Sequence, residues 1–285
     1  MDKTVYPHTK PVFVQSVDLI VRDLEGVSRY YERVIGLEVL ESGAKGRILG
    51  AGGEALLTLH LDANAEPSPR QAAGLFHTAF LLPERRDFAH FLKHVVENRT
   101  PVVGVADHLV SEALYLADPE GNGIEVYADR PVDAWTFDAE GVVLETKALD
   151  TRGLLAAAPD EPWRRLPPGT ALGHLHLQVG QIARAEEFYA DVMGLDIMER
   201  LPGASFFASG DYHHHLAANI WNSRHAIPRR DGMAGLQGYT LRFNDGERLK
   251  KTLAALEDLE IPVKNGPTGK VFRDPWGIGL RLESA

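Results

Sequence analysis

Hydrophobic residues near the start of the chain follow first a strand pattern and then a helix pattern. Residues 13–21 form a short, mostly apolar segment, which is typical of a buried strand. Asp23 is then a suitable helix N-cap, and Gly36 a suitable helix end. One apolar face of the helix between them is formed by Leu24, Val27, Tyr31 and Val34. Short β-rich segments separated by glycines follow, so the pattern predicts a βαβββ module.

The same order of elements recurs three more times along the chain. A second module starts near Leu75 and ends near Tyr127, a third starts near Leu172, and a fourth starts near Leu236. We therefore predict an α+β fold that consists of four βαβββ modules.

The modules are grouped in two pairs by an irregular, proline-rich stretch. Residues 131–170 contain this stretch, with a short helical patch near residues 154–158. We predict an N-terminal pair of modules in residues 1–130, a linker in residues 131–170 and a C-terminal pair in residues 171–285.

Internal similarity indicates that one half of the chain is a duplicate of the other. Residues 21–37 match residues 179–195, including the Gly-Leu pair at the end of each segment. Residues 118–126 match residues 274–282, and both segments begin with Asp-Pro. Corresponding positions in the two halves can therefore be compared residue by residue.

The two halves differ at positions where metal ligands could lie. The mismatches are Ser16 opposite His174, His77 opposite Gly238, and Glu125 opposite Arg281. Each mismatch has a good metal ligand on one side only, and the three ligands come from the middle of the chain. Arg281 would repel a cation, so the fourth module is predicted to hold none.

Composition restricts the classes of function. The 285 residues include 44% hydrophobic residues, and the formal net charge is −10. We expect a globular protein with a small-molecule ligand, because nucleic acid or an anionic membrane would require a clustered basic surface. The chain contains no cysteine, which excludes disulfides and thiolate chemistry. The N-terminus has no apolar signal segment, so we expect a cytoplasmic location.

Four long segments of the sequence resemble a known superfamily. They are residues 74–86 (GLFHTAFLLPERR), 107–131 (DHLVSEALYLADPEGNGIEVYADRP), 173–179 (GHLHLQV) and 211–221 (DYHHHLAANIW). These segments, and the four βαβββ modules, resemble two-domain catechol-2,3-dioxygenase-like proteins of the vicinal oxygen chelate superfamily. The resemblance implies that paired modules curve into two half-open barrels, and that a barrel can surround a metal ion.

The resemblance also implies the metal ligands. Extradiol ring-cleaving members bind iron(II) through two histidines and a glutamate, and the corresponding residues here are His77, His174 and Glu125. Two imidazoles and one carboxylate would occupy one face of an octahedral ion and leave the other positions for a catecholate and O2. Manganese(II) is an acceptable substitute for iron(II) with such ligands.

This ligand set requires modules from both halves of the chain. Only a pairing of the second module with the third brings two histidines and a glutamate together, which would leave the first and fourth modules to form a metal-free barrel. The alternative is a site within the first half that recruits Asp18, which would lie on the same strand face as Ser16.

The resemblance assigns acid–base and substrate-binding roles to further residues. His214, the second histidine of the 213–215 run, corresponds to the family's acid–base residue, and Tyr115 to a tyrosine that hydrogen-bonds the substrate. His108 is similar to a further pocket residue, and Tyr115 and His108 could instead be buried structural groups. We expect His213 and His215 to be surface residues at the start of a strand.

His176 shares a strand face with His174 and is a rival ligand or a group that orients one. The spacing to the following helix favours His174.

Three functions are compatible with these observations. The leading prediction is an extradiol dioxygenase that uses iron(II) and O2 to cleave a catechol-type small aromatic diol. The alternatives are a glyoxalase-type lyase or isomerase and a metal-free protein that binds an aromatic compound or drug. The substrate and the oligomeric state, including a homo-oligomer, are left open.

Overall fold

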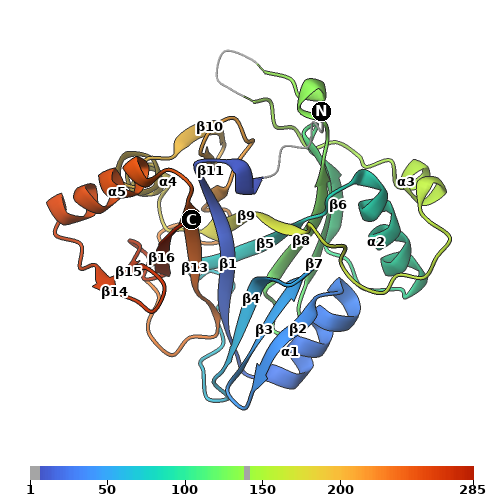
Figure 1. Ribbon diagram of the computed structural model, residues 1–285, viewed down its shortest axis with the longest axis horizontal. Helices are drawn as coiled ribbons and strands as arrows, with labels where there is room; N and C mark the ends of the chain where they lie inside the picture. Colours follow the sequence, from blue (N-terminus) through green and yellow to red (C-terminus); the bar gives the residue numbers. More distant parts are fainter. Residues whose placement is uncertain (1–6, 138–141) are drawn as a thin grey trace.

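The computed structural model describes residues 7–137 and 142–285, and its strands form two eight-stranded sheets (Figure 1). Module one comprises β1 (Val12–Val21), α1 (Leu24–Tyr30), β2 (Glu38–Gly43), β3 (Gly46–Ala51) and β4 (Glu54–Leu61). Module two comprises β5 (Gly74–Leu81), α2 (Arg85–Glu97), β6 (Gly104–Asp107), β7 (Ser111–Ala117) and β8 (Gly123–Asp129). Module three comprises β9 (Ala171–Gln178), α4 (Ile182–Glu186), β10 (Asp196–Leu201), β11 (Ala204–Ala208) and β12 (Leu216–Asn219). Module four comprises β13 (Gly235–Phe243), α5 (Gly246–Asp258), β14 (Lys264–Asn265), β15 (Lys270–Arg273) and β16 (Gly279–Ser284).

The first helix begins and ends where its sequence predicts. The Asp23 carboxylate accepts a hydrogen bond from the Gly26 backbone N–H (2.9 Å), which satisfies one of the free donors at the helix start. After Tyr30, the helix continues as a wider π-helical turn over Tyr31–Ile35. It ends at Gly36, whose positive φ of 94° is favourable only for glycine. In the duplicated half, α4 also continues as a π-helical turn, over Glu187–Val192.

Each sheet combines one module from the N-terminal half with one from the C-terminal half. The strand order is β14-β15-β16-β13-β1-β4-β3-β2 in one sheet and β10-β11-β12-β9-β5-β8-β7-β6 in the other. The central pairs, β1 with β13 and β5 with β9, are antiparallel. The predicted pairing of module two with module three is therefore confirmed, as is that of module one with module four. The domain boundaries inferred from sequence stay a prediction.

The helices cover the outer sides of the two curled sheets. In Figure 1, α2 lies beside α3 (Thr151–Ala157) on one side of the molecule, and α4 lies near α5 on the opposite side. Buried apolar side chains from both sheets form one large hydrophobic cluster. The α+β fold of two half-open barrels is confirmed. Among the residues described, no helix is both long enough and apolar enough to cross a membrane.

Candidate metal centre

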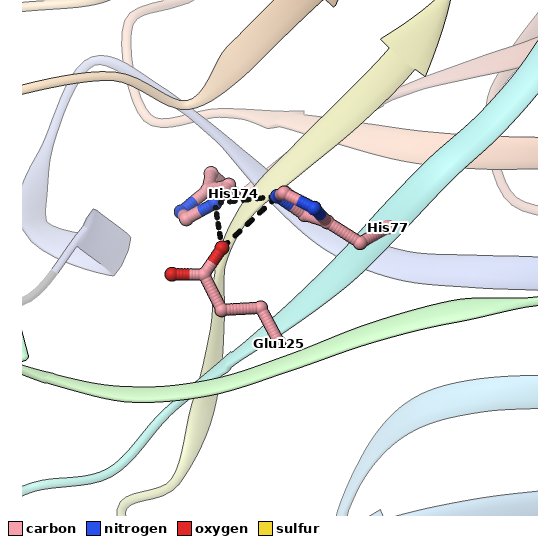
Figure 2. A group of neighbouring side chains, drawn as sticks. All are labelled: His77, Glu125 and His174. Atoms are coloured by element: carbon pink, nitrogen blue, oxygen red, sulfur yellow. Dashed lines mark hydrogen bonds and ion pairs between the residues drawn. The ribbon is translucent and has the colours of Figure 1, made fainter. Parts of the chain in front are cut away.

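Three neighbouring strands bring His77, Glu125 and His174 together (Figure 2). In the sheet of modules two and three, β5 lies between β8 and β9, so residues far apart in the sequence share one surface. His77 Nε2 lies 2.9 Å from Glu125 Oε2, and His174 Nε2 lies 3.1 Å from the same oxygen. The two Nε2 atoms are 3.4 Å apart. All three side chains are almost fully buried, and their donor atoms point to a common centre.

The charge states of His174 and Glu125 suit metal binding. Burial lowers the pKa of His174 to about 4, although the Glu125 carboxylate opposes this effect. Burial would raise the pKa of Glu125, but the imidazoles of His174 and His77 outweigh it and hold that pKa well below its usual range. A neutral imidazole and an ionised carboxylate are the forms that coordinate a cation.

The donor spacing also fits a divalent ion. Ligands about 2.1 Å from an ion and at right angles to each other lie about 3.0 Å apart. The three observed separations, 2.9, 3.1 and 3.4 Å, are close to this value. The donor set of two nitrogens and one oxygen leaves one side of such an ion open to other ligands.

The alternative ligand Asp18 lies elsewhere. It is on β1, in the other sheet, and its carboxylate pairs with His60 Nε2 at 2.9 Å. Arg281 is on β16 in that same sheet. Within the parts of the chain that the structure describes, the candidate metal cluster contains His77, Glu125 and His174.

His176 is close to the cluster but is engaged by another residue. The strand register places His176 directly opposite His77, and their ring centroids are 4.8 Å apart. The Asn219 amide nitrogen, however, lies 2.9 Å from His176 Nε2, while the Asn219 oxygen accepts a hydrogen bond from the Trp221 backbone N–H. Asn219 therefore donates to His176, and this nitrogen is occupied.

The predicted acid–base and substrate-binding residues lie around the cluster. The His214 ring is 4.1 Å from the His174 ring, measured between centroids, and burial holds the His214 pKa well below its ordinary value. The Tyr115 hydroxyl is 2.7 Å from His108 Nε2. Burial, assisted by Glu125, raises the pKa of Tyr115 well above its ordinary value, so this phenol keeps its proton.

The histidine run differs from its prediction. His213 and His215 were expected at the surface, at the start of a strand, but β12 begins only at Leu216 and both histidines are fully buried. His213 Nε2 lies 2.9 Å from an Asp129 carboxylate oxygen, and His215 Nδ1 accepts a hydrogen bond from the Ser209 backbone N–H (3.2 Å). Polar groups of the protein therefore take the place of water at His213 Nε2 and His215 Nδ1.

A cavity of about 1040 Å3 opens beside the cluster. The cluster residues, His214, Tyr115 and His108 all line it. Its apolar and aromatic lining includes Phe76, Val103, Leu144, Phe206 and Trp221. Leu144 shows that the linker between the halves provides part of the wall. The cavity is large enough for an aromatic ring with substituents.

Comparison with known proteins agrees with this geometry. The model of the Glyoxalase/Bleomycin resistance protein/Dioxygenase superfamily matches residues 13–126 and 171–282. The chain belongs to this superfamily. The chain is 43% identical over 236 residues to catechol-2,3-dioxygenase of Bacillus subtilis (strain 168). The matched region covers 81% of this chain and 82% of the Bacillus protein. The prediction of a catechol-2,3-dioxygenase-like enzyme is thereby confirmed.

Solved structures of other superfamily proteins share the fold. A provisionally named dioxygenase from Bacillus subtilis subsp. subtilis str. 168 superposes with a TM-score of 0.65 and 15% identity, over 96% of this chain and 86% of that one. Glyoxalase I from Zea mays gives a TM-score of 0.59 and 15% identity, over 96% of this chain and 93% of that one. At this identity, the likeness shows the fold alone.

Sequence reasoning missed a second layer of polar residues behind the cluster, namely Tyr127, Asp129 and Tyr212. The Tyr127 hydroxyl lies 3.3 Å from His174 Nδ1 and 2.7 Å from the Tyr212 hydroxyl. One signal was available, because Glu125, Tyr127 and Asp129 alternate along β8 and therefore share one strand face. No such signal exists for Tyr212, because it belongs to module three and reaches the Tyr127 hydroxyl of module two only in the folded protein.

Proposed function

We propose that the protein is an extradiol ring-cleaving dioxygenase that acts on a catechol-type aromatic with O2. His77, Glu125 and His174 would hold iron(II), and manganese(II) would be an acceptable substitute. The observation that carries this proposal is the buried cluster of two imidazoles and one carboxylate at the wall of a cavity large enough for an aromatic substrate.

When bound, iron(II) would bring the two catecholic oxygens and O2 together at one centre. The protein's own task is then to place the aromatic ring and move protons. Phe76 and Trp221, whose ring centroids are 5.4 Å apart, provide an aromatic wall for the substrate, and burial of the site restricts water.

Two side chains are suited to proton handling. His214 is neutral because of its burial, and it lines the cavity next to His174, so it can accept a proton from a catechol hydroxyl and return it later. Tyr115 keeps its proton and can donate a hydrogen bond to a substrate oxygen. His108, 2.7 Å from the Tyr115 hydroxyl, orients that phenol.

The ligand count favours a dioxygenase over a glyoxalase-type enzyme. A lyase or isomerase of that type usually uses a fourth protein ligand, whereas the described residues supply three ligands at this site. A metal-free binding protein would not need an acid–base histidine such as His214 beside the three candidate metal ligands.

The proposal is tested by reconstitution. Protein purified without metal is loaded anaerobically with iron(II) and then mixed with catechol and air-saturated buffer. We expect about one iron per chain, O2 uptake equal to catechol consumed, and a yellow ring-fission product. Iron binding without O2 uptake, for a panel of substituted catechols, would contradict ring cleavage and favour a lyase or isomerase. Absence of metal binding would contradict the entire site and favour a binding protein.

A further inference from the structure

A single buried carboxylate, that of Asp129, lies at the junction of two hydrogen-bond chains. Asp129 is the last residue of β8, and its side chain is almost fully buried. One carboxylate oxygen accepts a hydrogen bond from the Tyr212 hydroxyl at 2.9 Å. The other lies 2.9 Å from His213 Nε2. An ionised carboxylate can only accept hydrogen bonds, so both partners must donate.

The first chain runs from Asp129 to the candidate metal ligand His174. Because the Tyr212 proton points to Asp129, Tyr127 must be the donor in the 2.7 Å contact between the two hydroxyls. The Tyr127 oxygen can then only accept, so His174 donates through Nδ1–H across 3.3 Å. In this tautomer, His174 Nε2 carries the lone pair that would coordinate a cation bound beside Glu125 Oε2.

The second chain runs from Asp129 to the candidate acid–base residue His214. In an uncharged imidazole, donation from His213 Nε2–H to Asp129 leaves the lone pair on Nδ1. That atom lies 2.7 Å from His214 Nδ1, which must therefore carry the proton in this contact. His214 is left with its lone pair on Nε2, beside the cavity that the ring lines.

We infer that Asp129 is a positioning residue that sets the tautomers of both His174 and His214. One arm, through Tyr212 and Tyr127, directs a lone pair of His174 to the metal centre. The other arm, through His213, presents an unprotonated nitrogen of His214 to the substrate. A carboxylate is required at this position because one group has to accept from both arms at once. The inference rests on the proposed function only where it assigns proton transfer to His214.

The two arms can be broken separately. Tyr212→Phe removes the hydroxyl of the tyrosine arm, and His213→Phe removes both ring nitrogens of the histidine arm while keeping an aromatic ring. Asp129→Asn breaks at least one arm, because the amide nitrogen cannot accept a hydrogen bond. A matched control is Asp274→Asn, since Asp274, in the loop between β15 and β16, is also buried and accepts a hydrogen bond from Tyr189 (2.8 Å).

The test reads tautomers and metal affinity as well as turnover. Histidine-15N NMR of the metal-free protein, assigned with His214→Asn, is expected to show the Nδ1–H tautomer for His214. Asp129→Asn should change this tautomer or weaken Mn(II) binding, and Asp274→Asn should do neither. Tyr212→Phe should weaken Mn(II) binding, followed by the EPR signal of free Mn(II), by about 10- to 100-fold. It should leave the His214 tautomer as in the wild type.

Loss of the histidine arm is expected to affect turnover and not metal affinity. His213→Phe should bind Mn(II) within about twofold of the wild type, while kcat for catechol falls about tenfold or more and KM is unchanged. An Nε2–H tautomer at His214 in the wild type would overturn the inference, as would unchanged tautomers and metal affinity in Asp129→Asn. If Asp129→Asn does not fold, the two single-arm variants decide the question. A wild-type enzyme that cleaves no catechol would refute the proposed function, whereas the tautomer and affinity measurements would still test Asp129.

Discussion

Gly173 lies directly against the hydroxyl group of Tyr127. A Cβ atom at Gly173 would be 1.6 Å from Tyr127 Oη and 2.6 Å from Tyr127 Cζ, which is far inside contact distance. The absence of a side chain at residue 173 therefore lets Tyr127 approach Nδ1 of the next residue, His174, to 3.3 Å. The glycine is part of the support of the candidate metal centre.

Gly173→Ala is expected to displace the Tyr127 hydroxyl and weaken metal binding. Loss of an outer hydrogen bond to a histidine ligand typically costs about 10- to 100-fold in metal affinity. Gly104→Ala, on β6 of the same sheet, is the control, because a Cβ there meets no atom within 4 Å. Mn(II) titration of both variants measures the effect. Equal affinities would show that Tyr127 does not support the ligand.

Removal of any of the three candidate ligands is expected to abolish stoichiometric metal binding. His77→Ala, Glu125→Ala and His174→Ala should each lower affinity by more than about 100-fold, a larger loss than that of an outer hydrogen bond. Metal analysis of each variant after reconstitution measures this loss. Asp18→Ala is the control and should retain full metal, since Asp18 lies in the other sheet. Full metal in His174→Ala would show that the site does not use both halves of the chain.

His214→Ala is expected to bind iron normally but turn over slowly. Loss of an acid–base group typically costs about 100- to 10,000-fold in rate, so kcat should fall within this range. His60→Ala provides a control, because that histidine pairs with Asp18 outside this site. Steady-state kinetics and metal analysis of both variants separate the roles. Loss of iron from His214→Ala would instead identify His214 as a ligand.

His215 is expected to make the metal-free protein sensitive to acid. Burial lowers its pKa from 6.5 to about 3, so the unfolded chain binds a proton at His215 between these values while the folded chain does not. Stability from this residue is present at neutral pH and is lost as the pH falls below about 6.5. Between pH 7 and pH 5 the expected loss is about 2 kcal/mol.

His215→Asn removes the titrating group and places an amide where the Ser209 backbone N–H now donates to Nδ1. Urea unfolding at pH 7 and pH 5 should therefore show a smaller decrease in the free energy of unfolding for the variant. An identical decrease in both proteins would mean that His215 titrates normally in the folded state.

Much of the fold could be predicted because its signals are local. The Asp23 cap and the Gly36 end each depend on backbone groups a few residues away, so both positions could be recognised from the sequence. Duplication then made the order of the modules visible. Even the pairing of modules could be inferred, because only modules two and three together supply two histidines and a glutamate.

The environment of the histidines could not be predicted in the same way. An apolar strand preceded by three histidines was interpreted as a strand with imidazoles at the surface, yet His213 and His215 are buried. The partner of His213 is Asp129, from another module, and that of His215 is a backbone group of the preceding loop. Alternation along a strand indicates which side of the sheet a residue faces, but not which polar group it contacts in the folded protein.

The sequence by itself determined the modules, their helix ends and a short set of candidate metal ligands, because periodicity and chain order are local properties. Only the tertiary structure decided which histidine completes the centre. The register of β5 and β9 places His77 opposite His176, but Asn219 engages His176 while His174 reaches Glu125. These contacts join residues from different modules, and they exist only after the two halves of the chain have formed one sheet.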